Sequence, residues 1–374
     1  MSQRAQRRSR WSEPPDPERP KSPYQRDFTV VIKKHNPPPP FGNNFYPATN
    51  DTRKQPDDAF LYTATQTELV LAHPPQPRPS PPVPATATLK VIEMFKSPSD
   101  GRNAQVLICN ITLDPVPGGK PYTAVAKIFD PLYYQFRHDL APKPVDVTRA
   151  AEIDYAREAA AYQSLKSMGE AGSSAPQYYS SWIFELTFGY KRRTYTRPVC
   201  LVLMEYVDGA CMLNLFVRHD RKEKCGPGVH ALHYDEKYRI DVLGLLLDGI
   251  TRQEHGGVVQ NDCGARNIII VPPPFPSSAG KAPSPPRRVV LIDYNYALVD
   301  RETTTRPNDL PRNPMDLFWD RVNFFYELRG WVPDEWDRND NLFRRWLKDY
   351  FGGGRSQRYG EITRALEFDP EKKG

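Results

Sequence analysis

The chain has 374 residues, 40 prolines and a formal net charge of +6 at pH 7. This length accommodates one two-lobed domain with substantial tails, and so mild a charge gives only weak support to nucleic-acid binding. The five cysteines are scattered without C-x-x-C pairs, no secretory signal precedes them, and no apolar run is long enough to span a bilayer. We therefore expect an intracellular protein, cytoplasmic or nuclear, with no membrane partner.

Residues 1–86 form a proline-rich N-terminal segment, which we expect to be a mostly disordered tail. Such a composition buries too little apolar surface to offset the entropy lost on ordering. The stretches 28–33 and 60–72 are more apolar and are candidates for docking on the folded domain or on a partner. The basic start, QRAQRRSRW, is a solvated tail, a nuclear address or an anion-binding arm. The run HPPQPRPSPPVP is a linker or a ligand for a polyproline-binding partner protein.

The next two elements carry a lysine and a glutamate that are suited to an ion pair. Residues 122–129, YTAVAKIF, alternate as a β-strand does and contain Lys127. Residues 150–165 are rich in alanine and contain neither glycine nor proline, which predicts a helix. On that helix Glu158 can reach inward beside the apolar stripe, and Glu152 is a second candidate partner. Taken alone, Lys127 is equally an exposed strand residue and Glu158 a solvated helix charge.

Other segments predict a buried strand and three helices. Residues 200–209, CLVLMEYVDG, are typical of a buried strand followed by a turn. Residues 234–255 predict a long helix with Asp235 as its N-cap, and this helix leads directly into the next strand. Residues 315–328 and 341–351 predict two helices with aromatic side chains at helical spacing, which favours packing over ligand binding.

Two short apolar strands are followed by side chains that are suited to metal and proton handling. Asp262 and Asn267 lie in VVQNDCGARNIII, and Asp293 follows RRVVLI. Protein kinases place a catalytic-loop aspartate before an asparagine at this interval, and the aspartate of D-F-G after the next strand. Taken singly, each residue is more often a turn, cap or strand-end residue, but the set in this order favours a site. Cys263 is a redox-sensitive thiol or a buried free cysteine.

With Lys127, Glu158, Asp262, Asn267 and Asp293 in this order, the chain resembles protein-kinase-like domains. It is particularly similar to the small, divergent kinase-like proteins of filamentous fungi. The resemblance covers 87–359 and implies an α+β, two-lobed protein-kinase-like fold with a shortened C-terminal lobe. It implies the following division of the chain: an N-lobe at 87–207, a C-lobe at 208–359 with a proline-rich insertion at 272–287, and a C-terminal tail at 360–374.

The same resemblance implies a site for Mg²⁺ and ATP. Lys127, paired with Glu158, would bind the phosphates, Asn267 and Asp293 would hold Mg²⁺, and Asp262 would be the catalytic base. Met204 would be the gatekeeper, and Val125 would supply part of the apolar ceiling over the adenine. The backbone of Glu205, Tyr206 and Val207 would form the adenine-binding edge. The implied activity is transfer of the γ-phosphoryl group to a hydroxyl of an unknown protein or small-molecule acceptor.

The chain departs from the pattern of this family at four motifs. The family has a G-x-G-x-x-G loop, but residues 95–106 contain only Gly101, with Lys96 or Arg102 as basic substitutes. Gln260 and Asn261 replace the catalytic-loop histidine and arginine, D-F-G is D-Y-N, and no A-P-E follows. These departures favour a second hypothesis, a pseudokinase that serves as a binding or scaffold module. A third hypothesis is a proline-rich adaptor whose first 85 residues alone bind the partner.

Overall fold

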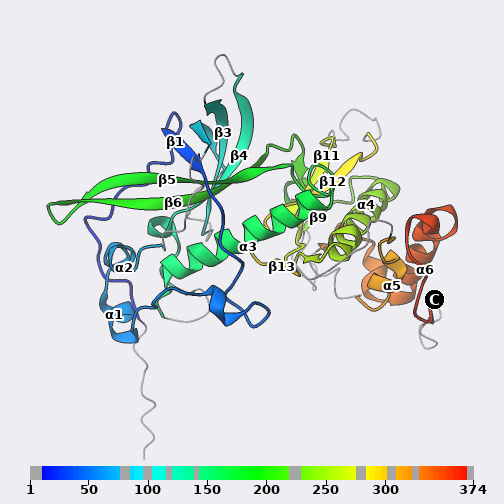
Figure 1. The fold of residues 1–374 in the computed structure, drawn as a ribbon. Helices are drawn as coiled ribbons and strands as arrows, with labels where there is room; N and C mark the ends of the chain where they lie inside the picture. Colours follow the sequence, from blue (N-terminus) through cyan, green and yellow to red (C-terminus); the bar gives the residue numbers. More distant parts are fainter. Residues whose placement is uncertain are drawn as a thin grey trace, which may run out of the picture. The chain divides into compact units, whose positions relative to one another are not determined.

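The structure is a computed structural model, and it describes residues 11–75, 85–95, 103–114, 120–138, 143–218, 229–274, 284–300, 309–321 and 328–368. The chain divides into two compact units (Figure 1). The first unit comprises Met1–Ala160 and Tyr179–Tyr206, and the second comprises Ala161–Tyr178 and Val207–Gly374.

The first unit is built on a closed barrel with the strand order β1-β2-β3-β4-β6-β5. Its strands are β1 (Thr29–Lys34), β2 (Thr86–Met94), β3 (Gln105–Asp114), β4 (Tyr122–Phe129), β5 (Tyr178–Tyr190) and β6 (Arg193–Glu205). Alternate residues fill the interior, as the two-residue repeat of a strand requires: Ala87, Leu89 and Val91 of β2 are all buried. The barrel closes through β1, which pairs with both β2 and β5, so that Lys33 lies opposite Thr86 and Ile183.

This architecture contradicts the two-lobed protein-kinase-like fold that we expected from the resemblance. The protein is a mixed α/β structure that contains a closed six-stranded antiparallel barrel and a modest amount of helix. The expectation of a largely disordered N-terminal tail was also wrong, because β1 from that segment completes the barrel. Residues 1–10 and residues 76–84 of the run HPPQPRPSPPVP lie outside the described residues, so the roles considered for these segments stay predictions.

Local signals explain why this proline-rich segment folds. In β1 the buried Ile32 follows the exposed Val31, which is the alternation of a strand with one face toward a core. Two short helices follow, α1 (Asp58–Thr63) and α2 (Gln66–Ala72). Thr65 and Glu68 form a capping box at α2, in which each side chain accepts a hydrogen bond from the backbone N–H of the other. Proline content averaged over the segment hides these signals.

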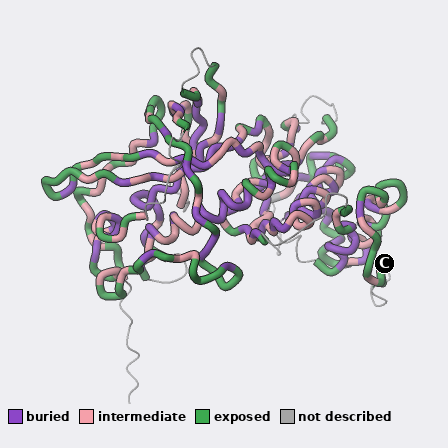
Figure 2. Tube along the Cα trace, in the orientation of Figure 1, coloured by how far each residue is buried: buried purple, intermediate pink, exposed green. Residues whose placement is uncertain are grey.

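Helix α3 (Val147–Ser167) extends the predicted helix at both ends. Asp146 stabilises its start, because its Oδ1 accepts a hydrogen bond of 3.0 Å from the Arg149 N–H. The division between the two units falls within α3, between Ala160 and Ala161. Residues 155–160 are all buried, so this part of the helix is covered on every side (Figure 2).

In the second unit the long helix is α4 (Glu236–His255), capped by Asp235 as the sequence predicts. The short strands pair antiparallel, and β11 lies between β12 and β7. These strands are β7 (Ala210–Cys211), β8 (Val217–Arg218), β9 (Val229–His230), β10 (Val258–Val259), β11 (Ile268–Val271), β12 (Arg288–Leu291) and β13 (Leu298–Val299). The remaining helices are α5 (Pro314–Phe318) and α6 (Asp340–Phe351). In the described ranges no helix is both long and apolar enough to cross a bilayer.

The last described segment packs on α5. The buried Asp316 accepts hydrogen bonds at Oδ2 from the Thr363 N–H and hydroxyl, at 3.2 and 2.7 Å. Helix α5 is shorter than the predicted helix at 315–328, of which residues 322–327 lie outside the described part. Helix α6 agrees with its prediction, and its aromatic residues pack on one another, with the Phe343 and Trp346 ring centroids 5.8 Å apart.

Candidate functional site

Lys127 and Glu158 form a buried ion pair in the first unit. Lys127 comes from β4 and Glu158 from α3, and Nζ lies 2.7 Å from Oε2. The two side chains are 8% and 0% exposed, so neither is the solvated surface charge that either residue alone would suggest. A charge buried at such a position requires an opposite charge, because desolvation alone would strongly disfavour it. Glu152, the rival partner, instead pairs with Arg53, Oε2 to Nε, at 3.2 Å.

The first residue proposed for the adenine site, Val125, lies on β4, the strand that also carries Lys127. Val125 lies directly opposite Met204 in the β4·β6 ladder, and Glu205 ends β6. Met204 is buried, whereas Tyr206 is exposed. Val207, which follows, belongs to the second unit. The structure therefore places Val125 and Met204 side by side, and their adenine-binding role stays a prediction.

In the second unit the side chain of Gln260 links the segment that contains Asp262 to the segment that contains Asp293. Its Nε2 donates to the carbonyl oxygens of Ile292 and Asp293 at 3.1 and 3.2 Å. Its Oε1 accepts a hydrogen bond of 2.8 Å from the Asp262 N–H. A glutamine amide carries both donors and acceptors, so one side chain satisfies all three backbone groups. Gln260, which stands where the kinase pattern has a histidine, thus connects the two segments through hydrogen bonds to their backbones.

Asn267 makes a second link between the same segments. Its Nδ2 donates to the Asp262 carbonyl at 2.9 Å, and its own carbonyl accepts a hydrogen bond of 2.9 Å from the Ile292 N–H. Asn267 is buried at the end of a short 3-10 helix (Ala265–Asn267). Gln260 and Asn267 together bring the predicted base and both predicted metal ligands into one hydrogen-bonded arrangement.

Asp293 has a left-handed backbone, with φ at +66°. Residues other than glycine rarely adopt this conformation, aspartate being among the more tolerant, and such strain concentrates at functional sites. The neighbouring side chain holds this turn in place. Tyr294 is fully buried, its hydroxyl donates to Gln253 Oε1 at 3.0 Å, and its ring packs edge-on against Tyr162.

Two more residues of the segment that contains Asp262 make defined contacts. Arg266 forms an ion pair with Asp262 through Oδ1, and the two side chains are 48% and 21% exposed. The Cys263 thiol donates to Gln260 Oε1 at 3.1 Å, and burial raises its pKa to about 12. Cys263 is half-buried, and since the thiolate is the reactive form, its raised pKa favours an unreactive free cysteine over the redox-sensitive thiol.

In the second unit, the side chains of Asn267 and Asp293 are the candidates to hold a metal ion. In the part of the chain that the structure describes, no three or more His, Cys, Asp or Glu side chains are grouped to hold a metal ion. Asn267 and Asp293 provide one amide and one carboxylate. Mg²⁺ is commonly held by one or two such oxygens and completes its shell with water and phosphate oxygens.

The candidate residues fall into two sets, Lys127 and Glu158 in the first unit and Asp262, Asn267 and Asp293 in the second. Gly101, Lys96 and Arg102 lie outside the described residues, as do residues 275–283 of the proline-rich insertion. Sequence reasoning missed the link made by Gln260. Nothing in the sequence marks that role, because it depends on backbone groups more than thirty positions away.

Comparisons with known proteins found only a distant structural similarity. No family model matches the chain, and no curated protein matches it. Among solved structures, the crystal structure of the BubR1 kinase domain is similar at 11% sequence identity and a TM-score of 0.33. The match covers 61% of this chain and 53% of the other, so the chain spans about half the length of that neighbour.

Proposed function

We propose that the protein is a Mg²⁺- and ATP-dependent phosphotransferase that acts on a hydroxyl of a protein or a small molecule. The observation that carries this proposal is the arrangement around Gln260, which brings together Asp262, Asn267 and Asp293. Phosphoryl transfer needs little covalent chemistry from a protein. It needs acceptors for a metal ion, a carboxylate for the attacking hydroxyl and a cation for the phosphates.

Each candidate residue has a defined task in this proposal. Lys127 binds phosphate oxygens of ATP, and Glu158 orients its ammonium group. Asn267 commits its amide nitrogen to the Asp262 carbonyl, so its amide oxygen is the atom offered to a cation, together with the Asp293 carboxylate. When bound, Mg²⁺ would neutralise charge on the β- and γ-phosphates. Asp262 accepts the proton of the attacking hydroxyl, and Arg266 orients its carboxylate through Oδ1.

The test is ATP turnover by purified Asp262→Asn and Asp293→Ala variants. Loss of a general base typically lowers the rate by about 10²–10⁴-fold, so Asp262→Asn should lose most turnover. Asp241→Asn is a matched control, because Asp241 is likewise an aspartate in an ion pair with a basic residue four positions away. Turnover that survives in either site variant at the rate of the control would contradict the assigned roles.

One observation supports a second candidate function, a nucleotide-binding module without phosphoryl transfer. Asp262 is already engaged by Arg266, in a segment where Gln260 and Asn261 replace the usual histidine and arginine. The two functions separate when thermal stabilisation by ATP, with and without Mg²⁺, is measured beside turnover. A ligand at 100 times its dissociation constant stabilises a protein by about 2.7 kcal/mol, which is readily detected. Stabilisation without turnover would favour the module.

A further inference from the structure

Residues 35–53, which we call the N-terminal wrap, follow β1 and contact helix α3 at several positions. His35 Nδ1 and the Tyr155 hydroxyl are 2.7 Å apart, and both residues are buried. The Phe41 carbonyl accepts a hydrogen bond of 2.9 Å from Arg157 Nε. Gly42, at φ +92°, passes so close to α3 that a Cβ there would lie 2.5 Å from Ile153 Cδ1.

Three ion pairs, two from a basic and one from an acidic residue of the wrap, join the end of the wrap to the start of α3. Arg53 contacts both Asp146 and Glu152, and its side chain is 5% exposed. Asp51 Oδ2 lies 2.9 Å from Arg149 Nε. Because a basic and an acidic residue of the wrap each meet the opposite charge on the helix, sliding the wrap along α3 would bring like charges together. The ion pairs therefore fix which residues of the wrap lie against which residues of α3.

The later part of the wrap contacts the side of α3 that faces away from Glu158, whereas His35, at its start, contacts Tyr155 near the side of Glu158. With about 3.6 residues per turn, positions nine and five residues before Glu158 lie roughly half a turn around the helix from it. These positions are Arg149 and Ile153, both of which contact the wrap. Glu158 meets Lys127 of β4 on its own side of the helix. The wrap thus supports α3 behind the ion pair and, through His35, also near the side of Glu158.

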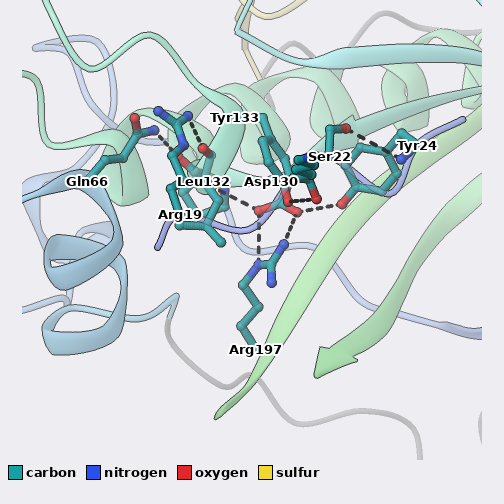
Figure 3. A network of polar contacts seen from close by, with 10 residues as sticks. Arg19, Ser22, Tyr24, Gln66, Asp130, Leu132, Tyr133 and Arg197 are labelled. Carbon is teal, nitrogen blue, oxygen red and sulfur yellow. Dashed lines mark hydrogen bonds and ion pairs between the residues drawn. The ribbon is translucent and has the colours of Figure 1, made fainter. Parts of the chain in front are cut away.

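The segment that precedes the wrap is fastened to the end of the strand that carries Lys127. Figure 3 shows Tyr24 and Arg197 converging on Asp130, which directly follows β4. The Tyr24 hydroxyl donates to Asp130 Oδ2 at 2.5 Å, and Arg197 binds both carboxylate oxygens, at 3.2 and 2.7 Å. All three residues are buried. One continuous segment therefore holds both the strand of Lys127 and the helix of Glu158.

We propose that the N-terminal wrap positions Glu158 for Lys127, so that Asp51 and Arg53 are positioning residues for the lysine that binds phosphate. The effect on the ion pair is a property of the first unit. Its consequence, weaker ATP binding when the wrap detaches, rests on the function proposed above.

The experiment uses the full chain and reverses one ion pair at a time. Asp51→Arg, Arg149→Asp and the double variant are compared with the wild type. Acetylation of Lys127 by an amine-reactive ester is followed by peptide mass spectrometry, and hydrogen exchange reports on the backbone around Glu158. The Arg149→Asp variant places an acidic residue in the first turn of α3, where the helix dipole stabilises negative charge. The substitution therefore does not itself weaken the helix. Lys90→Glu is the matched control, because Lys90 pairs with Asp27 of the same N-terminal segment but not with α3.

Each single reversal should raise Lys127 acetylation and α3 exchange by about fivefold, the effect of one partly exposed ion pair. The double variant should restore both to within about twofold of the wild type. The control should change neither. Wild-type rates in Asp51→Arg, or no rescue in the double variant, would overturn the proposal.

Titration with Mg·ATP separates this inference from the proposed function. If the wild type binds ATP, each single reversal should weaken that binding by a similar factor, and the double variant should recover it. If the wild type does not bind ATP, the proposed function fails, and Lys127 acetylation and α3 exchange still decide whether the wrap positions the ion pair.

Discussion

The Lys127 ammonium and the Glu158 carboxylate lie 2.7 Å apart, and protein atoms enclose both side chains. Two charges in such a place depend on each other more than either contributes alone. Removing one partner of a buried pair leaves the other charge uncompensated, whereas apolar residues can replace both at little cost.

Replacing either residue alone should therefore destabilise the protein more than replacing both. We expect Lys127→Met and Glu158→Leu each to lower the free energy of unfolding by about 3–5 kcal/mol, and the double variant to lose less than either single variant. Denaturant unfolding of the three variants measures the coupling. Additive losses would mean that the two residues do not interact as the distance indicates.

Gln260 offers a sharper test because its donor and acceptor atoms can be removed separately. Gln260→Glu keeps an acceptor for the Asp262 N–H but loses the donor to the Ile292 and Asp293 carbonyls, and Gln260→Leu loses both. Each variant should cost about 1–3 kcal/mol, because the Ile292 and Asp293 carbonyls lose their donor. Hydrogen exchange at the Asp262 amide should stay slow in Gln260→Glu and become fast in Gln260→Leu. Equal exchange in the two variants would contradict the assigned contacts.

The ladder that closes the barrel can be tested with neighbouring residues of β1. Ile32 is fully buried and Val31 is 54% exposed. We expect Ile32→Ala to lower the free energy of unfolding by about 2–5 kcal/mol, and Val31→Ala to change it by less than about 0.5 kcal/mol. Thermal denaturation of both variants gives the comparison. If neither substitution has an effect, residues 29–34 are not part of the folded unit.

The buried carboxylate of Asp130 should make its partners unequal in importance. Arg197→Met leaves that charge without its bidentate cation and should cost about 3–5 kcal/mol. Tyr24→Phe removes one hydrogen bond to a charged group and should cost about 1.5–3 kcal/mol. Denaturant unfolding ranks the two, and Arg197→Lys should be intermediate, since an ammonium cannot bind both oxygens in the planar manner of a guanidinium. A larger loss in Tyr24→Phe than in Arg197→Met would contradict this order.

Cys263 should react slowly while the protein is folded. Burial raises its pKa from 9.0 to about 12, so at pH 8 the folded thiol contains far less thiolate than the unfolded one. Alkylation by iodoacetamide should be slower in the folded protein than in urea by roughly 100-fold or more. Because the folded pKa is the higher one, this group favours the folded state below pH 9, and that contribution is lost as the pH rises toward 12. Fast labelling of the folded protein at pH 8 would contradict so high a pKa.

Elements with strong local signals could be predicted from the sequence. The alternation of YTAVAKIF gave β4, and the alanine-rich run gave most of α3. Asp235 caps α4 as predicted, because capping depends only on adjacent residues. The order of the candidate residues along the chain could also be read directly from the sequence.

Long-range pairing explains what could not be predicted. Closure of the barrel depends on the pairing of β1 with β2 and β5, and no local pattern in TVVIKK predicts those pairing partners. The left-handed turn at Asp293 and the link made by Gln260 likewise depend on tertiary contacts. The order of the motifs led us to expect a two-lobed fold. That order records which residues are present, but it carries no information on how the strands around them close into a barrel.

Closure of the barrel through β1 also orders the events of folding during synthesis. A ribosome releases the chain from its N-terminus, and domains begin to fold while later residues are still being added. Lys33 can pair with Thr86 early, but it has no partner on its other side until Ile183 has been made. Until then both β1 and the growing sheet present open edges, which are prone to pairing with other chains. Strand β1 is therefore synthesised long before its second partner, and its pairing in the barrel is completed only when β5 is available.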